Sequence, residues 1–422
     1  MNAHGAEYDA FFPLAQTLEW KGWMMVFFLL YHYWDVKPAY NAVRVAVGAY
    51  LFLTGYGNYL SLSKKGPSLT KLAASVLRIN FFTFLVMATT GRGWVLYYIA
   101  PLHTLWTAVV YGLFSMPTAW PMRYRLAGVL AVIVFIYEVP YVADTIFLPL
   151  YPLLSYCGSL KEWVFRSRLD AYAPWAGMAF AAAVPKLVDF LDARGVWGSG
   201  GGVGGGGDSM VSSSESSSDS GSGGSVNNSV LPQLSSPLPS APLTLFRAVG
   251  WSGLVDVNGR IQWRPLSIGS CVILLALVHS TQYAKHRFDY NSTHRLLEWV
   301  PITTFLLLRN LTPALRRVHL RLFAWLGEMS LELYILQFHV WMAGDAKKIV
   351  VLFPAFRTLS FFTATLGFVV LAACASAATG TLIKAIDAHG HNAVLASAAV
   401  LLLGISIINF MPGSCAVGGG GG

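Results

Sequence analysis

The stretch EWKGWMMVFFLLYHY, residues 19–33, is an apolar run that opens on Glu19 and Lys21 and closes on His32. An α-helix rises about 1.5 Å per residue, so Lys21 and His32 lie about 16 Å apart on nearly the same helix face. Desolvating an ionisable side chain in a membrane costs several kcal/mol, which makes it a candidate functional residue by default. The alternative is that His32 is an anchor at the headgroup level, where aromatic residues also gather.

The composition around this run is that of a membrane protein. Of 422 residues, 55% are hydrophobic and 12% charged, with a mean hydropathy of +0.54, whereas soluble domains carry about 25% charged residues. The formal net charge of +9 comes from Lys and Arg dispersed at the ends of apolar runs, which indicates membrane topology and no nucleic-acid partner. The sequence therefore predicts an all-α, polytopic membrane helical bundle.

Candidate spans of roughly 20 apolar residues occur on both sides of a region of different composition. About ten or eleven of them are predicted, near residues 21–38, 40–61, 72–90, 94–115, 124–143, 170–192, 266–284, 297–310, 322–343, 358–383 and 393–411. Residues 297–310 form a short segment that could be re-entrant, and residues 144–160 are predicted to be an irregular interfacial loop.

Gly, Ser and Pro dominate residues 195–242, which predicts a flexible, disordered linker. The predicted membrane domain then has a first part of about six spans in residues 1–194 and a second part of about four or five spans in residues 243–411. Residues 412–422 are predicted to be a disordered tail.

Absolute topology depends on weak features. We take the face of the N-terminus as cytosolic because dense basic clusters lie at residues 64–71 and 316–321. The sequon Asn291-Ser292-Thr293 falls on the opposite face, as expected for a glycoprotein with a lumenal side. The four cysteines are far apart and are predicted to be single residues rather than a disulfide framework: Cys157, Cys271, Cys374 and Cys415.

The alternation of spans places ionisable residues from six spans at a similar depth, near the face opposite the N-terminus. These residues are His32, His103, Glu138, Arg166, Arg168, Asp170, Glu298 and His339. Charges inside a membrane usually turn inward and pair with one another, so we expect them to converge on one cavity. The alternative is a set of unrelated interfacial anchors.

Three histidines with carboxylates and arginines suit proton transfer to and from a hydroxyl group. The arginines also suit a clamp on phosphate or carboxylate. Because no HxxxH or HxxE spacing occurs among His32, His103 and His339, no metal is predicted. The chain contains neither a GxSxG motif nor a P-loop.

The same residues carry a resemblance to a known family, which covers roughly residues 16–194 and 264–383. The motifs are EWKGWM (19–24), YHY (31–33), YNAVR (40–44), TGYGN (54–58), RINFF (78–82), residues 97–104 and 165–172, WVPI (299–302) with RN (309–310), and residues 323–341. The chain resembles the ten-span polysaccharide and sialic-acid O-acetyltransferases, and is most similar to the plant Reduced Wall Acetylation proteins. The resemblance implies a multi-pass protein of Golgi membranes that acetylates glycans with acetyl-CoA as the donor substrate.

The resemblance also suggests roles for particular residues. His32 is expected to be the general base or a transient acyl acceptor, with Lys21 and Glu19 at the entrance of its helix. In the wider acyltransferase-three superfamily a basic residue and a histidine, with ten residues between them, are functional in the first core helix; here Lys21 stands where arginine is usual. Position and chemistry, rather than the resemblance, give the other expected site residues: His103, His339, Glu298 and Glu332 as catalytic residues, and Arg166 and Arg168, together with Lys21, as residues that bind the donor.

Glu298 or Glu332 is expected to orient a histidine, although Glu332 could equally be a buried packing charge bonded across helices.

Two departures from the family pattern leave alternatives open. Animal members carry a lumenal serine-hydrolase-like domain before the membrane part, and plant-type members begin with additional spans. Neither feature is found in this sequence. We therefore expect either a shortened form of the protein or an incomplete gene model. A separate lumenal serine-hydrolase-like acetyltransferase is thus a possible partner, besides the glycan acceptor and membrane lipid. The alternative functions are a transporter that moves acetyl groups or acetyl-CoA across the Golgi membrane, and a scaffold for the true transferase.

Overall fold

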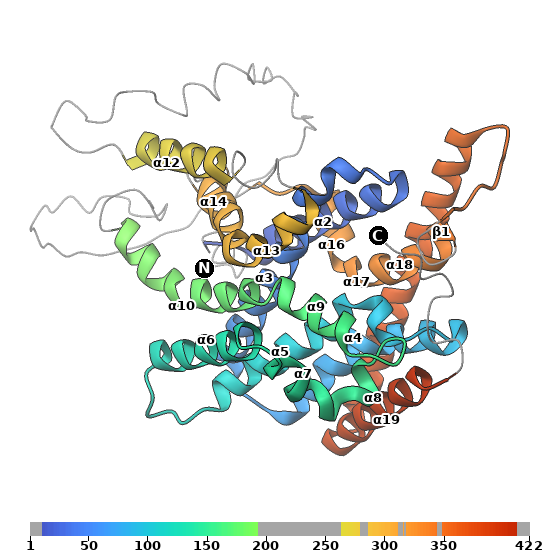
Figure 1. Ribbon diagram of the computed structural model, residues 1–422, viewed down its shortest axis with the longest axis horizontal. Coiled ribbons are helices and arrows are strands. Elements are labelled where there is room, and N and C mark those ends of the chain that lie inside the picture. The colour runs from blue at the N-terminus through green and yellow to red at the C-terminus, as the bar shows by residue number, and fades with distance from the viewer. Residues whose placement is uncertain are drawn as a thin grey trace, which may run out of the picture.

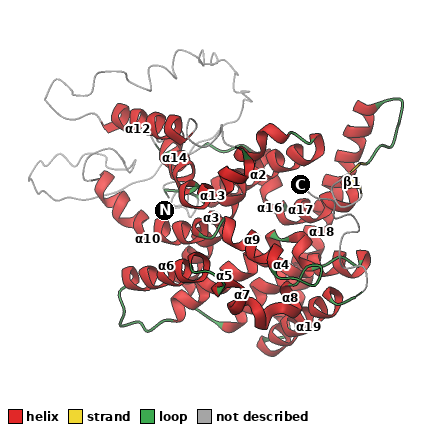
Figure 2. Cartoon of the chain, in the orientation of Figure 1, coloured by secondary structure: helices red, strands yellow, loops and turns green. Residues whose placement is uncertain are grey.

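The computed structural model describes residues 11–192, 263–278, 286–310, 315, 318–343 and 348–411, and these residues are almost wholly helical (Figure 2). The predicted all-α fold is confirmed. Within the described residues the strands are two short antiparallel ones, β1 (Met342–Ala343) and β2 (Lys348–Ile349). The predicted linker, residues 195–242, and the predicted tail, residues 412–422, lie outside the described residues.

The helices before the predicted linker run in this order: α2 (Leu14–Trp34), η1 (Lys37–Ala39), α3 (Tyr40–Lys65), α4 (Leu69–Thr90), η2 (Trp94–Tyr97), α5 (Ile99–Ser115), α6 (Met122–Glu138), α7 (Val142–Phe147), η3 (Leu148–Leu150), α8 (Tyr151–Leu154), α9 (Lys161–Leu169) and α10 (Tyr172–Asp192). The helices after it are α12 (Trp263–Val278), α13 (Arg287–Leu297), α14 (Trp299–Arg309), α16 (Arg321–Glu328), α17 (Ser330–Leu336), the π-helical segment η5 (Gln337–Trp341), α18 (Arg357–Ala388) and α19 (His391–Asn409).

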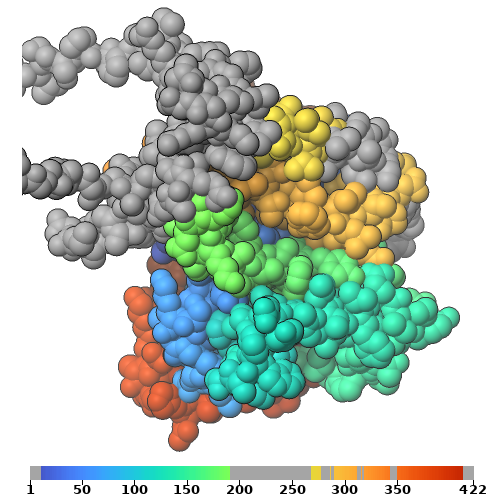
Figure 3. Space-filling model, turned by 90° about the vertical axis from the view of Figure 1, so that its left-hand side faces the viewer, coloured from blue at the N-terminus to red at the C-terminus, as the bar shows by residue number. Residues whose placement is uncertain are grey.

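Helices from the two sides of the predicted linker pack against each other. α2 packs along α16 and α4 packs along α19 (Figure 1). Within the first half of the chain, α3 packs along α10. In the space-filling view of one face, the orange second-half segments lie directly above the green segments near residue 170 (Figure 3). This agrees with the contacts of α13 with α9 and α10.

The crossing of α2 and α16 depends on a glycine. A Cβ atom placed on Gly22 would lie 1.9 Å from the backbone oxygen of Phe323. Small residues at helix crossings let backbones approach closely, and this approach is a main source of helix association in membranes. Gly22 is therefore required by the geometry of this crossing.

The first helix differs at both ends from the predicted span, residues 21–38. It begins at Leu14 and ends at Trp34, where Asp35 adopts the left-handed conformation with φ 47°. The helix extends through polar residues because these residues have tertiary partners: Gln16 Nε2 donates to the backbone oxygen of Leu315, and Glu19 pairs with Arg309. Apolarity alone therefore placed the start too late.

Three described helices are long and apolar enough to cross a membrane by length and composition: α4, α18 and α19. A fourth is added if α6 and the α7–α8 segment, bent by 102° to each other, form one broken span. Residues 144–160, predicted to be an irregular loop, instead form the short helices α7, η3 and α8, followed by a bridge between Tyr156 and Ser159.

Two further predictions need correction. The predicted segment 297–310 is preceded by a helix that hydropathy did not reveal, α13, which meets α14 at Glu298. Cys157 was predicted to be a single residue, yet it is disulfide-bonded. Cys271 and Cys374 are free thiols.

Candidate active site

A pocket of about 400 Å³ lies between α2, α3, α9 and the segments η2 and η5. Its lining residues are Phe28, Tyr31, His32, Tyr40, Val43, Arg44, Val47, Val95, Leu96, Tyr98, Tyr156, Glu162, Arg166 and Phe338. Of the eight predicted site residues, His32 and Arg166 line this pocket, and the other six are not among its lining residues. The pocket combines an imidazole, two guanidinium groups and several tyrosines.

His32 and Arg166 are held in the pocket by different contacts. The His32 ring packs edge-on against Phe28, with 4.5 Å between ring centroids, one turn earlier on α2. Arg166 Nε donates to Glu162 Oε1 at 2.8 Å, and its guanidinium lies 4.6 Å from the centroid of the Tyr98 ring. The second arginine, Arg44, lies in the YNAVR motif and is not among the predicted site residues. The pocket can thus hold an imidazole beside fixed positive charge.

Behind Arg44 lies a buried polar cluster that includes one predicted site residue, Glu298. Arg44 pairs with Asp170, and His294 Nε2 lies 3.1 Å from Asp170 Oδ1 and 3.1 Å from Glu298 Oε2. His294 is not among the residues predicted from the sequence, although its spacing of four residues from Glu298 puts both side chains on one face of a helix.

A second polar group lies deeper in the bundle, one turn or more along α3 from the pocket. His103 is hydrogen-bonded through Nδ1 to Thr54, and its ring packs edge-on against Tyr50. Lys21 also faces Tyr50, with its Nζ 6.0 Å from the ring centroid. His103 and Lys21 are therefore brought together around Tyr50, away from the pocket of His32.

Glu332 belongs to the same deeper region. Its side chain is 1% exposed, and its Oε1 accepts a hydrogen bond of 2.6 Å from Arg78 on α4. The neighbouring Ser330 is hydrogen-bonded to Tyr50, at 2.6 Å between the oxygens. Glu332 is thus bonded across helices, which fits the alternative considered for it from the sequence.

His339 and Arg168 lie at two further places. His339 Nε2 is 2.5 Å from the Tyr97 hydroxyl, next to the pocket residue Phe338. Arg168 Nη2 lies 3.6 Å from Glu138 Oε2, to which Arg295 is also paired at 2.8 Å. The expected convergence of all these residues on one cavity is therefore not what the structure shows.

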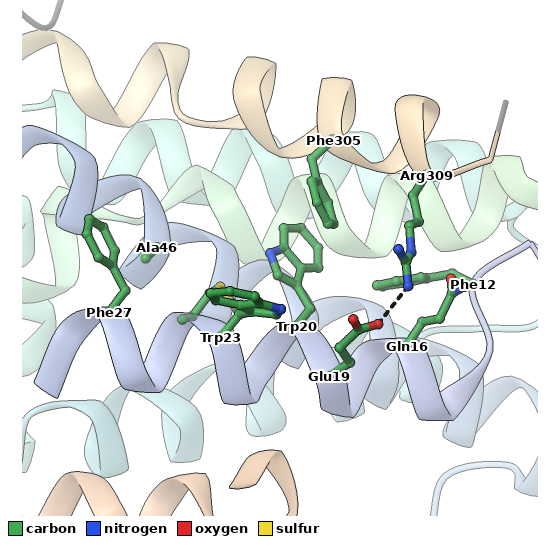
Figure 4. Close-up of a pocket in the computed structure, with 10 residues that line it drawn as sticks. Phe12, Gln16, Glu19, Trp20, Trp23, Phe27, Ala46, Phe305 and Arg309 are labelled. Carbon is green, nitrogen blue, oxygen red and sulfur yellow. Dashed lines mark hydrogen bonds and ion pairs between the residues drawn. The ribbon is translucent and has the colours of Figure 1, made fainter. Parts of the chain in front are cut away.

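An aromatic groove of about 330 Å³ lies on the other side of α2, between α2 and α14. Trp20 stacks on Phe305 with 4.8 Å between ring centroids, and Glu19 and Arg309 form an ion pair of 2.7 Å at the end of the groove (Figure 4). Glu19 was expected beside Lys21 at the entrance of the His32 helix. Instead it is bound to α14, because the helix starts before it.

Arg166 and Arg168 are close in sequence but differ in position, so replacing each of them in turn tests whether the pocket is the active site. Two residues along a helix turn the side chain by about 200°, so only Arg166 reaches the pocket. We expect Arg166→Ala to lower kcat/KM for the reaction in this pocket by ~10 to 100-fold, the usual cost of a lost charged hydrogen bond. Arg168→Ala should change it by less than about 3-fold.

Steady-state kinetics of both purified variants would check this prediction. Equal losses in the two variants would contradict the separation of these arginines in the structure.

The geometry defines a helical membrane protein with a histidine–arginine pocket, and comparison with known proteins gives its class. Residues 3–190 and 259–398 match the family model described as the ten-transmembrane acyltransferase domain found in Cas1p. The chain belongs to this family and is a multi-pass membrane acyltransferase domain. The predicted linker, residues 195–242, lies in the break between the two matched ranges.

A curated relative is N-acetylneuraminate (7)9-O-acetyltransferase from Danio rerio, which is 29% identical over 385 residues. The alignment covers 85% of this chain and 41% of that protein, so the chain spans less than half the length of this relative. No solved structure matches the chain.

Proposed function

We propose that this protein transfers an acetyl group from acetyl-CoA to a hydroxyl group of a glycan, as a membrane O-acetyltransferase of the cell-wall or another glycan-modifying system. The observation that carries the proposal is His32 beside Arg166 in one pocket of a chain that belongs to an acyltransferase family. Support for the sugar acceptor and the acetyl group comes from the name of the zebrafish relative.

The proposed reaction uses His32 as the general base. Its imidazole takes the proton of the sugar hydroxyl as the oxygen attacks the thioester carbonyl, and the C–S bond then breaks to release CoA, which takes up the proton. Arg166 supplies positive charge for a donor phosphate or for the oxygen that becomes negative during attack. In the variant with a covalent step, an unprotonated nitrogen of His32 first accepts the acetyl group and then passes it to the hydroxyl.

Golgi membranes are the proposed location, with the pocket on the lumenal face. The disulfide-bonded Cys157 is exposed and follows Tyr156, which lines the pocket. Disulfides persist in oxidising compartments such as the secretory pathway and are rare in the cytosol. This supports a lumenal pocket mouth, from which acetyl groups could also reach a separate lumenal serine-hydrolase-like transferase.

A transporter of acetyl groups or acetyl-CoA is the second candidate. The observation that favours it is the polar group of Lys21, His103 and Tyr50, which lies in the bundle beyond the pocket. Intramembrane polar residues commonly mark transport routes. On this alternative the chain would move the acetyl group without forming the ester.

An assay in two membrane formats separates the candidates. Purified protein in nanodiscs, which enclose no compartment, is incubated with acetyl-labelled acetyl-CoA and a mixture of oligosaccharides, with empty nanodiscs as the control. We expect label in base-labile esters on the oligosaccharide. No ester in nanodiscs, combined with label accumulating inside sealed proteoliposomes, would refute the transferase and support the transporter.

A further inference from the structure

A cluster of four ionisable side chains lies buried where three parts of the fold meet. Arg44 comes from α3, Asp170 from the junction of α9 and α10, His294 from α13, and Glu298 from the junction of α13 and α14. These residues are 4%, 1%, 1% and 1% exposed, respectively. Arg44 pairs with Asp170, and its other side lines the pocket of His32. Such a cluster is stable only if its charges and hydrogen bonds are compensated.

The contacts of His294 are unusual for a hydrogen-bonded histidine. Its Nδ1 lies 2.9 Å from the Tyr290 hydroxyl, while its Nε2 lies 3.1 Å from oxygens of both Asp170 and Glu298. One N–H group can point at only one of these carboxylates. If Nδ1 carries the proton instead, a nitrogen lone pair faces two negative oxygens.

Glu298, whose Oε2 is one of these two oxygens, shows the other half of the same deficit. Neither of its carboxylate oxygens accepts a hydrogen bond from any described residue, although the side chain is fully buried. A buried carboxylate without donors is costly unless a cation is close. Helix α3 leaves space for the Glu298 carboxylate because residue 48 is a glycine: a Cβ atom on Gly48 would lie 2.3 Å from Glu298 Oε2.

We propose that Asp170, His294 and Glu298 bind a divalent transition-metal ion, of which zinc is the best-fitting example. One ligand atom of each residue lies within 4.8 Å of the others. In a tetrahedral site with bonds of about 2.0–2.1 Å, ligand atoms lie about 3.3 Å apart, close to the two 3.1 Å separations from Nε2. Imidazole nitrogen and carboxylate oxygen are both zinc ligands.

The neighbours of these residues support the assignment. The Tyr290 hydroxyl faces Nδ1, where a hydrogen-bond acceptor would fix the tautomer that leaves Nε2 free to bind metal. Arg44 contacts the second oxygen of Asp170, so this carboxylate is oriented from behind. The ion would join the α9–α10 junction to α13 and the α13–α14 junction, and the pairing of Asp170 with Arg44 would then hold Arg44 at the pocket wall. This assignment replaces the sequence-based expectation of no metal, which considered only the other histidines.

Metal content tests the proposal without reference to activity. The full chain in nanodiscs is equilibrated with Zn²⁺, passed through a desalting column and measured by inductively coupled plasma mass spectrometry. We expect about one zinc ion per chain. Glu298→Gln, which keeps the side-chain shape, and His294→Ala should each reduce this by at least about 5-fold. The control His391→Ala removes an exposed histidine and should retain the ion.

If the variants do not fold, measurements on the wild-type protein alone still test the proposal. Treatment with a zinc chelator should lower its thermal unfolding temperature, and added Zn²⁺ should restore it. Less than about 0.2 zinc per chain, with an unfolding temperature that neither chelator nor Zn²⁺ changes, would overturn the proposal. The cluster would then be a charge-balanced set in which protonated His294 and Arg44 offset the two carboxylates.

Discussion

His32→Ala is expected to lower the rate of acetyl transfer by at least about 100-fold, because a positioned general base contributes ~10²- to 10⁴-fold to catalysis. The side chain lines the pocket and its ring packs on Phe28, so its loss removes the only imidazole among the residues that line this pocket. Label transfer from acetyl-CoA to an oligosaccharide in nanodiscs, measured at saturating donor, would give the rate. Donor binding, measured by equilibrium dialysis, should change far less than the rate.

Two further variants make this result specific. His32→Gln keeps a polar side chain of similar size but cannot act as a base near neutral pH, so we expect it to be as inactive as alanine. His391→Ala removes an exposed histidine at the start of α19 and should leave the rate unchanged. A His32→Ala protein that is folded and retains more than about a tenth of the wild-type rate would exclude His32 as general base.

Gly22→Ala is expected to destabilise the protein by about 3 kcal/mol or more, because the added methyl group would meet a backbone oxygen rather than a movable side chain. The ideal Cβ position lies 1.9 Å from the oxygen of Phe323, so α2 and α16 must separate to accept it. Thermal unfolding of the purified protein in detergent, together with the yield of monodisperse material, would measure the effect.

The matched control is Gly57→Ala on α3. No atom lies within 4 Å of a Cβ placed at this position, and the residue is exposed. Replacing a helical glycine by alanine at such a site is neutral or stabilises by up to ~1 kcal/mol. Similar losses in both variants would show that the close packing of α2 on α16 does not determine the effect at Gly22.

Hydropathy predicted the helices whose apolar runs are continuous and missed those whose burial depends on polar contacts. The predicted span 72–90 matches α4 (Leu69–Thr90) to within three residues at its start. Helix α13 contains His294 and Arg295 and is not apolar enough to be recognised, yet it is packed against α3, α9 and α10. Its position is decided by ion pairs with residues distant in the sequence, which a local pattern does not contain.

The candidate site was predictable to a similar degree. His32 was singled out because a histidine inside an apolar run is costly, and the structure places it in the pocket. The separation of Arg166 from Arg168 follows from helix periodicity, and so does the pairing of His294 with Glu298 four residues later. The pairing of Arg44 with Asp170 joins residues 126 apart in the sequence and depends on the tertiary fold.

Helix α3 runs without a break from Tyr40 to Lys65. Its first turns carry Arg44 at the wall of the pocket, and its middle carries Tyr50 and Thr54 beside His103. An unbroken helix moves as a rigid rod, so a tilt that widens the pocket must also shift the groups around His103. We therefore expect occupancy of one polar region to change the free energy of the other through this shared helix.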